Sequence, residues 1–322
     1  MERRLNGWRR ALLATAMACA AGALPAQPVP HTVRLLVGYA AGGPVDQAAR
    51  VIAPVLAREL GTNVVVENKP GANATTAGDT VARAGADGSL LWFAASPTVT
   101  ISPNVMKMPF DPARDLTPVA PILSYYNVLV INKELPFKSL RELVEYARAN
   151  PTKVSYGSAG VGGSNHLSGE LLAARTGTKM LHVPYKGNAP AMTDVIGGQL
   201  TMMFDIISTA RTYIAAEKVR AIAVTSPARN PSLPQVPTMT ESGIPDYEVG
   251  GWYAVYGPAQ LPKALAARYT QAFAGALKDP ELKAKLDAAG YELWTGGPEV
   301  VNARAGKERA MWATVTKDIK VE

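Results

Sequence analysis

Cysteine and histidine are almost absent from this chain of 322 residues, which has one cysteine, Cys19, and three histidines. Cys19 lies in an N-terminal segment with the composition of a leader, so the chain that remains after cleavage would have no thiol and no disulfide. Three scattered histidines without cysteine do not form a metal-binding pattern. These shortages argue against thiol chemistry and metal chemistry, and we expect no metal and no cofactor.

Motifs of nucleotide binding and of hydrolysis are also missing. The chain has no G-x-x-x-x-G-K-[ST] segment and no G-x-G-x-x-G followed by a ribose-binding acid. It has no G-x-S-x-G elbow. Ser164 and His166 are two residues apart and point in different directions on a helix, so they do not form a nucleophile–base pair. His31 and His182 have no evident partner in the sequence.

The N-terminus has the layout of a secretory signal peptide. Four arginines precede an apolar run over 11–23, and small residues follow. We expect cleavage after Ala23 or Ala26, a periplasmic location, and neither a lipid on Cys19 nor a retained anchor. Residues 1–26 carry four arginines and one glutamate, so the net charge falls from +7 to +4. This mild excess forms no basic stripe, so we expect no nucleic-acid partner.

What the chain does contain is an alternation of β-rich runs, glycine loops and amphipathic runs. Strands are predicted at 33–39, 63–68 and 90–96, and again at 126–132, 200–207 and 219–226. A helix with Ala49, Ile52, Ala53 and Leu56 on one face follows the first strand, and Ser139 is predicted to cap another. The order indicates an α/β fold with parallel sheets and two domains. The segment over 102–121 is rich in proline and is predicted to be a connection between elements.

Three glycine loops share one design: "GYAAGGPVD" (38–46), "KPGANATT" (69–76) and "YGSAGVGGSN" (156–165). Each follows a predicted strand and opens a predicted helix, and in a parallel sheet such loops gather where ligands bind. Helix starts offer unpaired N–H groups and the positive end of a dipole. The loops are therefore suited to hold a small anion such as a carboxylate without an arginine. Ordinary helix caps and turns are the alternative for each loop taken alone.

The same segments carry a resemblance to a known family. "VRLLVGYAAGGPVDQAARVIAPVLAREL", "VVVENKPGANATTAGDTVA", "YGSAGVGGSNHLSGELL", "HVPYKGNAPAMTDVIGGQLTMMFD" and "VPTMTESGIPDYEVGGWYAVYGPAQLP" resemble, in order and spacing, the tripartite tricarboxylate transporter receptors, the Bug (TctC) family. The resemblance runs from about Val33 to the C-terminus. It implies a bilobed type II periplasmic binding protein, a Venus flytrap of two α/β domains. Domain one would comprise 27–127 with 252–322, domain two 128–251, and the crossovers would fall near 124–127 and 250–253.

The resemblance also implies a function without catalysis. The chain would be a monomeric receptor that captures a small carboxylate ligand and delivers it to membrane transporter subunits. A monocarboxylate, a dicarboxylate, an amino acid and an aromatic acid all remain open as ligands. An extracytoplasmic sensor of the same ligands is one alternative, and a periplasmic enzyme that uses Asp205 is another.

Site residues follow from the resemblance position by position. The expected ligand-binding residues are Tyr39, Ala41, Gly42, Gly43, Asn73, Ser96, Thr98, Ser158, Ala159, Gly160, Ser164, His166, Tyr185 and Asp205. In the first loop, Ala41, Gly42 and Gly43 would aim their N–H groups at the carboxylate.

Several of these residues have a structural alternative. Asp46 is expected to brace the first loop rather than to touch ligand, and Val45 stands where the family often has a hydroxyl. Asn73 fits a turn, and Ser96 and Thr98 fit helix caps. His166 fits a loop brace. Asp205 fits a helix cap, and Lys186 a surface salt bridge.

Overall fold

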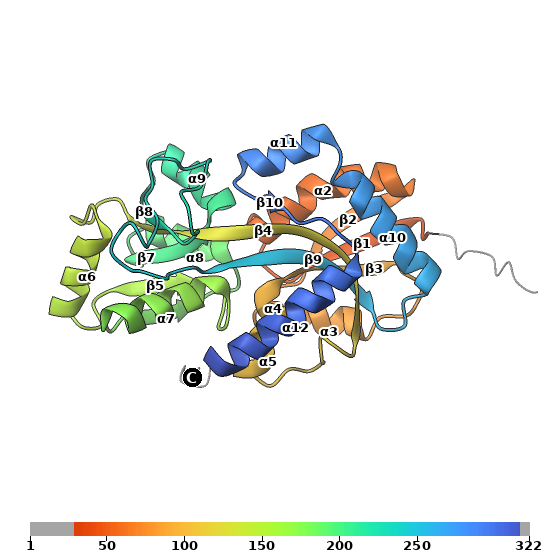
Figure 1. The fold of residues 1–322 in the computed structure, drawn as a ribbon, viewed down its shortest axis with the longest axis horizontal. Helices are drawn as coiled ribbons and strands as arrows, with labels where there is room; N and C mark the ends of the chain where they lie inside the picture. The colour runs from red at the N-terminus through yellow and green to blue at the C-terminus, as the bar shows by residue number, and fades with distance from the viewer. Residues whose placement is uncertain (1–28, 316–322) are drawn as a thin grey trace, which may run out of the picture.

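One long strand, β4 (Leu116–Asn132), runs through both halves of the molecule and is shared by two sheets. The structure is a computed structural model that describes residues 29–315. The predicted leader at 1–26 lies outside the described residues, as does Cys19. In Figure 1, β4 and β9 (Gly250–Pro258) run side by side across the middle, with one group of helices on each side. The molecule is therefore bilobed.

The remaining elements complete the two lobes. The other strands are β1 (Thr32–Val37), β2 (Asn63–Asn68), β3 (Leu90–Ala95), β5 (Ser155–Ser158), β6 (Leu181–Pro184), β7 (Met202–Ile206), β8 (Val219–Val224) and β10 (Glu292–Leu293). The helices are α2 (Pro44–Leu60), α3 (Thr75–Ala82), α4 (Ser96–Thr100), α5 (Ser102–Val105), α6 (Leu140–Ala149), α7 (Ser164–Thr176), α8 (Asn188–Ile196), α9 (Ile207–Ala215), α10 (Lys263–Ala276), α11 (Pro280–Ala288) and α12 (Pro298–Val315).

Each lobe has the same sheet plan. In lobe one, β1 is parallel to both β2 and β3, and β9 lies antiparallel between β3 and β4. In lobe two, β5 is parallel to both β6 and β7, and β4 lies antiparallel between β7 and β8. The predicted parallel pairing is confirmed for β1–β3 and β5–β7. It is wrong for the strands that connect the lobes, which are antiparallel.

The prediction of a proline-rich connection over 102–121 is wrong for its last six residues, because β4 begins at Leu116. Proline cannot donate to a β-ladder, so it is expected only at edges and irregularities of a sheet. The pairing of β4 with β9 shifts register between Pro118 and Ala120 and again between Pro121 and Leu123. The prolines thus sit where the ladder is already broken, and the strand continues through them.

Helix α2 forms where the sequence predicts it. Ala49, Ile52, Ala53 and Leu56 are all buried, as expected from their spacing. The helix ends at Gly61, whose φ of 68° is a left-handed conformation that glycine adopts without strain. The Ser139 cap of α6 is also confirmed, since its Oγ accepts a hydrogen bond from the Glu142 N–H at 3.2 Å.

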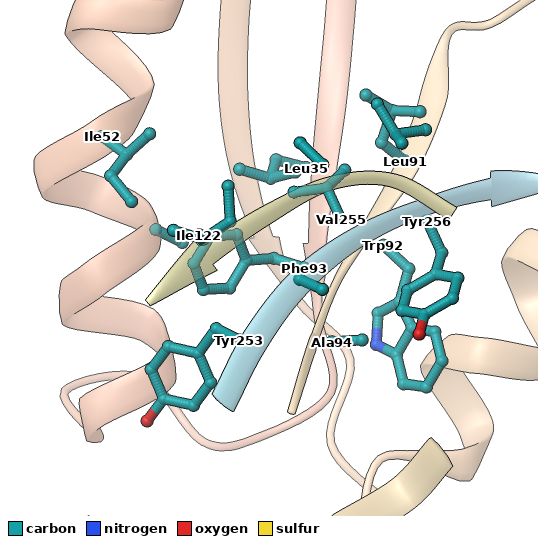
Figure 2. Close-up of a cluster of buried hydrophobic side chains, with 14 of the residues drawn as sticks. Leu35, Ile52, Leu91, Trp92, Phe93, Ala94, Ile122, Tyr253, Val255 and Tyr256 are labelled. Carbon is teal, nitrogen blue, oxygen red and sulfur yellow. The ribbon is translucent and has the colours of Figure 1, made fainter. Parts of the chain in front are cut away.

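Two hydrophobic regions hold the lobes together. Lobe one has a single large core between its sheet and the helices α2, α10 and α12, and Figure 2 shows part of it around Leu35, Leu91 and Phe93. Lobe two has a separate cluster on each face of its sheet, one around Phe204 and one around Met203. Neighbouring residues of β7 thus face opposite cores. Within the described range, no helix has both the length and the apolar character that a membrane span requires.

Helix α12 braces the place where the chain passes between the lobes. Ser124 of β4 pairs with Trp252 of β9 at this crossover. The Trp252 indole N–H donates to the Glu308 carboxylate at 2.9 Å, and Arg304 donates to Ser124 Oγ at 3.0 Å. Arg304 also donates to Glu308 at 2.8 Å. One ion pair therefore ties both crossover strands to the same helix.

Two helical glycines give opposite predictions for stability. A Cβ at Gly169 in α7 would lie 2.2 Å from the Tyr156 ring, whereas a Cβ at Gly306 in α12 would meet nothing within 4 Å. Gly169→Ala should destabilise the protein by about 1–3 kcal/mol through overpacking. Gly306→Ala should stabilise it by roughly 0.5–1 kcal/mol, because alanine loses less entropy in a helix. Chemical denaturation of both variants measures the two effects, and equal effects of the same sign would contradict this packing.

Candidate functional site

A small cavity lies between the lobes at the carboxyl ends of their parallel strands. Residues at or just after the ends of β1, β3, β5 and β7 contribute to its wall, which is the place where ligands bind in open α/β sheets. The lining residues are Tyr39, Val45, Asn73, Ala95, Pro97, Tyr125, Ala159, Gly163, Ser164, Asn165, Asn188 and Ile206. No charged side chain is among them. We call this space the inner cavity.

The starts of four helices meet at the inner cavity. Val45 is the second residue of α2, Ser164 opens α7, Asn188 opens α8, and Ile206 precedes α9. None of these four helices has a side chain that caps its N-terminus. Each start carries a partial positive charge, equivalent to roughly half a proton. The helix starts therefore contribute positive potential to the cavity wall without a lysine or an arginine, and such a contribution favours an anionic group.

A buried hydroxyl and amide network forms the lobe-one wall. The Tyr39 hydroxyl donates to Asn73 Oδ1 at 3.0 Å and lies 3.2 Å from Thr98 Oγ1. Thr98 Oγ1 donates to the Asn73 carbonyl at 2.7 Å, and Asn73 Nδ2 donates to Ser102 Oγ at 3.1 Å. Burial raises the pKa of Tyr39 to about 12, so its hydroxyl stays protonated. The network fixes Tyr39 and Asn73 toward the cavity, and Thr98 acts from behind them.

The first glycine loop is held by its own aspartate. The Asp46 carboxylate accepts from the Gly42 N–H at 2.9 Å, from Arg50 at 2.9 Å and from Asn68 at 2.9 Å. Hydrogen bonds from Arg50, Gly42 and Asn68 outweigh the opposing effect of burial and lower the pKa of Asp46. The expected bracing role of Asp46 agrees with these contacts. The Gly42 N–H, which we expected to face the ligand, is directed instead to this carboxylate.

The neighbouring residues of that loop are placed differently from one another. The Gly43 N–H points to the Ala40 carbonyl at 3.4 Å, inside the loop. Ala41 is exposed and lines no cavity. The Ala40 N–H donates to the Lys186 carbonyl of lobe two at 3.1 Å, so this loop also joins the lobes.

Ser96 lies behind the cavity, at the crossover. Its Oγ accepts from the Trp252 N–H at 3.1 Å, and it also faces the Tyr125 hydroxyl. The same hydroxyl meets Ser164 of lobe two, so Tyr125 connects β4 with the start of α7. Burial raises the pKa of Tyr125, which keeps this contact neutral. Tyr125 lines the inner cavity, whereas Ser96 influences the cavity only through its contact with Tyr125.

The corresponding loop of lobe two is residues 158–164, which we call the clamp loop. Ser158 Oγ accepts from the Gly160 N–H at 3.1 Å and lies 2.7 Å from His182 Nε2. His166 Nδ1 accepts from the Gly162 N–H at 3.2 Å. His166 therefore braces the loop and lines neither cavity. The absence of a partner for His182, taken from the sequence, is wrong: the partner lies 24 residues away, on the neighbouring strand β5.

Asp205 is buried behind the cavity wall, with 1% of its surface exposed. Its carboxylate accepts from Asn188 Nδ2, from the Ile206 N–H at 2.8 Å and from Thr209 Oγ1 at 2.7 Å. Burial raises the pKa of Asp205 to about 6, and these hydrogen bonds only partly oppose that rise. Asp205 thus orients Asn188, which does line the cavity, and joins the starts of α8 and α9.

A larger outer cavity of ≈ 650 Å³ opens beside the inner one. Tyr39, Asn73 and Ala159 line both spaces, so the two adjoin. Gly160, Tyr185 and Lys186 of lobe two also line the outer cavity, and Lys186 is the one charged residue in its wall. The Tyr185 hydroxyl donates to Asp194, which turns the phenol toward its own lobe. The inner cavity itself holds ≈ 20 Å³, the space of about one water molecule.

The expected site residues fall into two groups. Tyr39, Asn73, Ala159, Gly160, Ser164 and Tyr185 line one or both cavities. Ala41, Gly42, Gly43, Ser96, Thr98, Ser158, His166 and Asp205 do not. Tyr125, Asn165, Asn188 and Ile206 line the inner cavity and were missed as site residues. The signal for Asn165 and Asn188 is their position: each is one of the first two residues of a helix that follows a strand.

Comparisons with known proteins fit this geometry. The sequence model of the tripartite tricarboxylate transporter family receptor matches residues 48–321. The structure is similar to that of the periplasmic binding protein BugD, with a TM-score of 0.87 and 34% identity over 90% of this chain and 98% of that one. It is also similar to MatC from Rhodopseudomonas palustris with bound malate, with a TM-score of 0.85 and 30% identity over 89% and 99% of the chains. A third similar structure is that of an R. palustris protein with adipate, with a TM-score of 0.86 and 33% identity over 89% of this chain and 97% of that one.

The buried carboxyl of Asp205 predicts a pH-dependent stability. A pKa near 6 in the folded state, against 3.8 for the free side chain, favours folding below pH 3.8, and this contribution is lost as the pH rises through 6. Asp205→Asn should therefore gain about 2–3 kcal/mol in unfolding free energy relative to the unmutated chain between pH 4 and pH 7.5. Denaturant unfolding at both pH values measures this gain. Asp246→Asn, at an exposed turn, is the control, and a difference that shrinks as the pH rises would contradict the assignment.

Proposed function

The chain belongs to the tripartite tricarboxylate transporter receptor family, and on that premise we propose that its two lobes close on a small dicarboxylate in the periplasm. Members of this family are solute-binding receptors and not enzymes, and the family's solved structures include periplasmic binding proteins. The leader over 1–26 would direct export. The receptor would act as a monomer and pass its ligand to the membrane subunits of the transporter.

One observation carries the proposal: four uncapped helix starts, from both lobes, meet at a cavity without a charged side chain. A carboxylate accepts hydrogen bonds only, so it matches a wall of N–H and O–H donors. Charge-assisted bonds of this kind contribute about 1.5–3 kcal/mol each. Ser164, Asn165 and Asn188 add neutral polar groups beside the helix starts. The inner cavity would thus receive one carboxylate of the ligand.

The outer cavity supports a second carboxylate. Lys186 is exposed and has no ion pair among the described residues, and it stands at the wall of a space that adjoins the inner cavity. Most of that wall is apolar or backbone, which suits a short carbon chain between two charged ends. Malate and adipate, the acids bound by two relatives, have this form. A dicarboxylate would then span the two spaces.

Closure would follow as a shift in population. Lobe one comprises 27–127 with 252–322 in this proposal, and lobe two comprises 128–251. A carboxylate bonded to helix starts of both lobes stabilises the closed form alone, so it biases the equilibrium toward closure. Because the inner cavity has room for about one water molecule, the lobes must part, or wall side chains must turn, before a ligand enters. A full reversal of the equilibrium needs on the order of 5 kcal/mol of differential affinity.

A thermal-shift screen tests the proposal directly. Purified chain lacking residues 1–26 is heated with each member of a panel that includes malate, adipate, aspartate, glutamate, nicotinate and benzoate. A ligand present at 100 times its Kd should stabilise the folded state by about 2.7 kcal/mol and raise the Tm. Calorimetry then measures stoichiometry, and one-to-one binding without turnover is expected. A panel in which no acid binds would refute the receptor assignment for these acids.

The role of Lys186 has its own test. Lys186→Gln should weaken binding of the dicarboxylate that the screen selects by about tenfold, because one charge-assisted contact is lost. Binding of the corresponding monoacid, hexanoate in the case of adipate, should stay unchanged. Lys179→Gln, at an exposed lysine of the same lobe outside both cavities, is the matched control. Equal losses for diacid and monoacid would assign Lys186 a structural role instead.

A further inference from the structure

Two imidazole rings stand in contact behind the clamp loop. His166 of α7 and His182 of β6 have ring centroids 4.1 Å apart, and the Tyr156 ring stacks on His182 at 5.0 Å. His166 is 5% exposed and His182 half-buried. The rings come from different elements, and each reaches the same loop from a different side. This pair has no place in the binding site itself, since neither ring lines a cavity.

Each ring controls one amide of the clamp loop. His166 Nδ1 accepts directly from the Gly162 N–H at 3.2 Å. His182 Nε2 acts through Ser158, whose Oγ is 2.7 Å away and accepts from the Gly160 N–H at 3.1 Å. Gly160 has a φ of 136° and Gly162 a φ of 77°. These conformations are open to glycine but not favoured by the chain on its own, so the loop needs contacts that select them.

The loop shaped in this way faces the other lobe closely. A Cβ at Gly160 would lie 3.5 Å from the Asn73 Cα, and one at Gly162 would lie 3.2 Å from Val105. Gly163 and Ser164 then begin α7 at the inner cavity. A change in the path of the clamp loop would therefore move a helix start and a cleft surface together.

We propose that His166 and His182 are positioning residues that hold the clamp loop in its ligand-binding shape, His166 through Gly162 and His182 through Ser158. The inference deepens the proposed function and rests on it, because it concerns the geometry of the same site. Neither ring touches the ligand. Both rings act only through the backbone of the clamp loop.

The pair works in its neutral form. A proton on His166 Nδ1 would remove the acceptor of the Gly162 N–H, so the ring proton must reside on Nε2, which faces Glu170 Oε1 at 3.8 Å. The Tyr156 hydroxyl, from β5, donates to the same carboxylate. Burial lowers the pKa of His166 to about 4. At His182, burial and the neighbouring His166 ring together lower the pKa to about 4 against the opposing effect of Glu170. The hydrogen bonds that the two rings provide to the clamp loop should therefore hold from neutral pH down to about pH 5 and weaken as the pH approaches 4.

The two nitrogens suggest a swap experiment. The Asn side chain places its amide oxygen near the position of Nδ1, and Gln places its amide near Nε2, with both a donor and an acceptor. His166→Asn and His182→Gln should therefore retain the loop, whereas His166→Gln and His182→Asn should lose it. All four variants exchange an imidazole for an amide, so each mismatched variant has a matched control at its own position.

Amide hydrogen exchange of the ligand-free protein, measured by NMR, is the first readout. Exchange of Gly162 in His166→Gln and of Gly160 in His182→Asn should be about five- to tenfold faster than in the unmutated chain, as expected for one lost hydrogen bond. The matched variants should stay within about twofold. Ser158→Ala, which leaves both rings in place, should accelerate Gly160 alone. Mismatched variants that protect both amides as the unmutated chain does would overturn the proposal.

Calorimetric titration with malate and with adipate is the second readout. The mismatched variants should bind about tenfold more weakly than the matched ones at neutral pH. If a mismatched variant at one histidine does not fold, the matched and mismatched variants at the other histidine decide the case. If neither acid binds the unmutated chain, the dicarboxylate assignment fails, while the exchange data still test the positioning role. If both acids bind equally to all variants, the positioning role fails and the receptor assignment stands.

Discussion

The meeting of helix starts from both lobes at one uncharged cavity is the constraint on which the rest of the structure depends. A site made of main-chain dipoles works only if the backbone of each loop is held to a fraction of an ångström, because the donors cannot turn to follow a ligand as side chains do. Much of the buried polar chemistry of the chain serves this end. Asp46 holds the first loop, Asp205 holds Asn188, and Tyr39 with Thr98 holds Asn73. The carboxylates of Asp46 and Asp205 lie one layer behind the inner cavity, where they orient the groups that form its wall.

Sequence reasoning predicted the repeated units of the fold better than the strands between them. Periodic apolar spacing in α2 and the Ser139 cap are local signals, and both were read correctly. The antiparallel course of β4 and β9 is set by partners more than a hundred residues away, which no local pattern reveals. The prolines at 118 and 121 hid the first half of β4, because their place at register shifts is visible only in the sheet. Helix α12 was not predicted. The contacts that hold it, from Arg304 and Glu308 to the crossover strands, join segments far apart in the sequence.

The site shows the same division between local and distant information. The three glycine loops were recognised because a glycine-rich turn before a helix is a short signal with a physical reason. Which residues of each loop face the cavity was harder to predict, since Gly42 and Ser158 have side-chain partners that fold onto them. Tyr125 lies outside the segments that carry the resemblance, and Asn188 lies inside one of them but was not selected as a site residue. Both reach the cavity because β4 and α8 pass beside it. Residue type and spacing thus located the site, and tertiary packing assigned its members.

The placement of β9 has a consequence for the order in which the chain assembles. This strand lies between β3 and β4 in the lobe-one sheet, yet it begins at Gly250, after the whole of lobe two. During synthesis, the first sheet cannot be completed until the second lobe has emerged. Contacts of such long sequence separation are slow to form, and unfinished sheet edges are prone to aggregate. For a chain exported as we propose, this delay would keep the first half unfolded for longer and so favour export before folding.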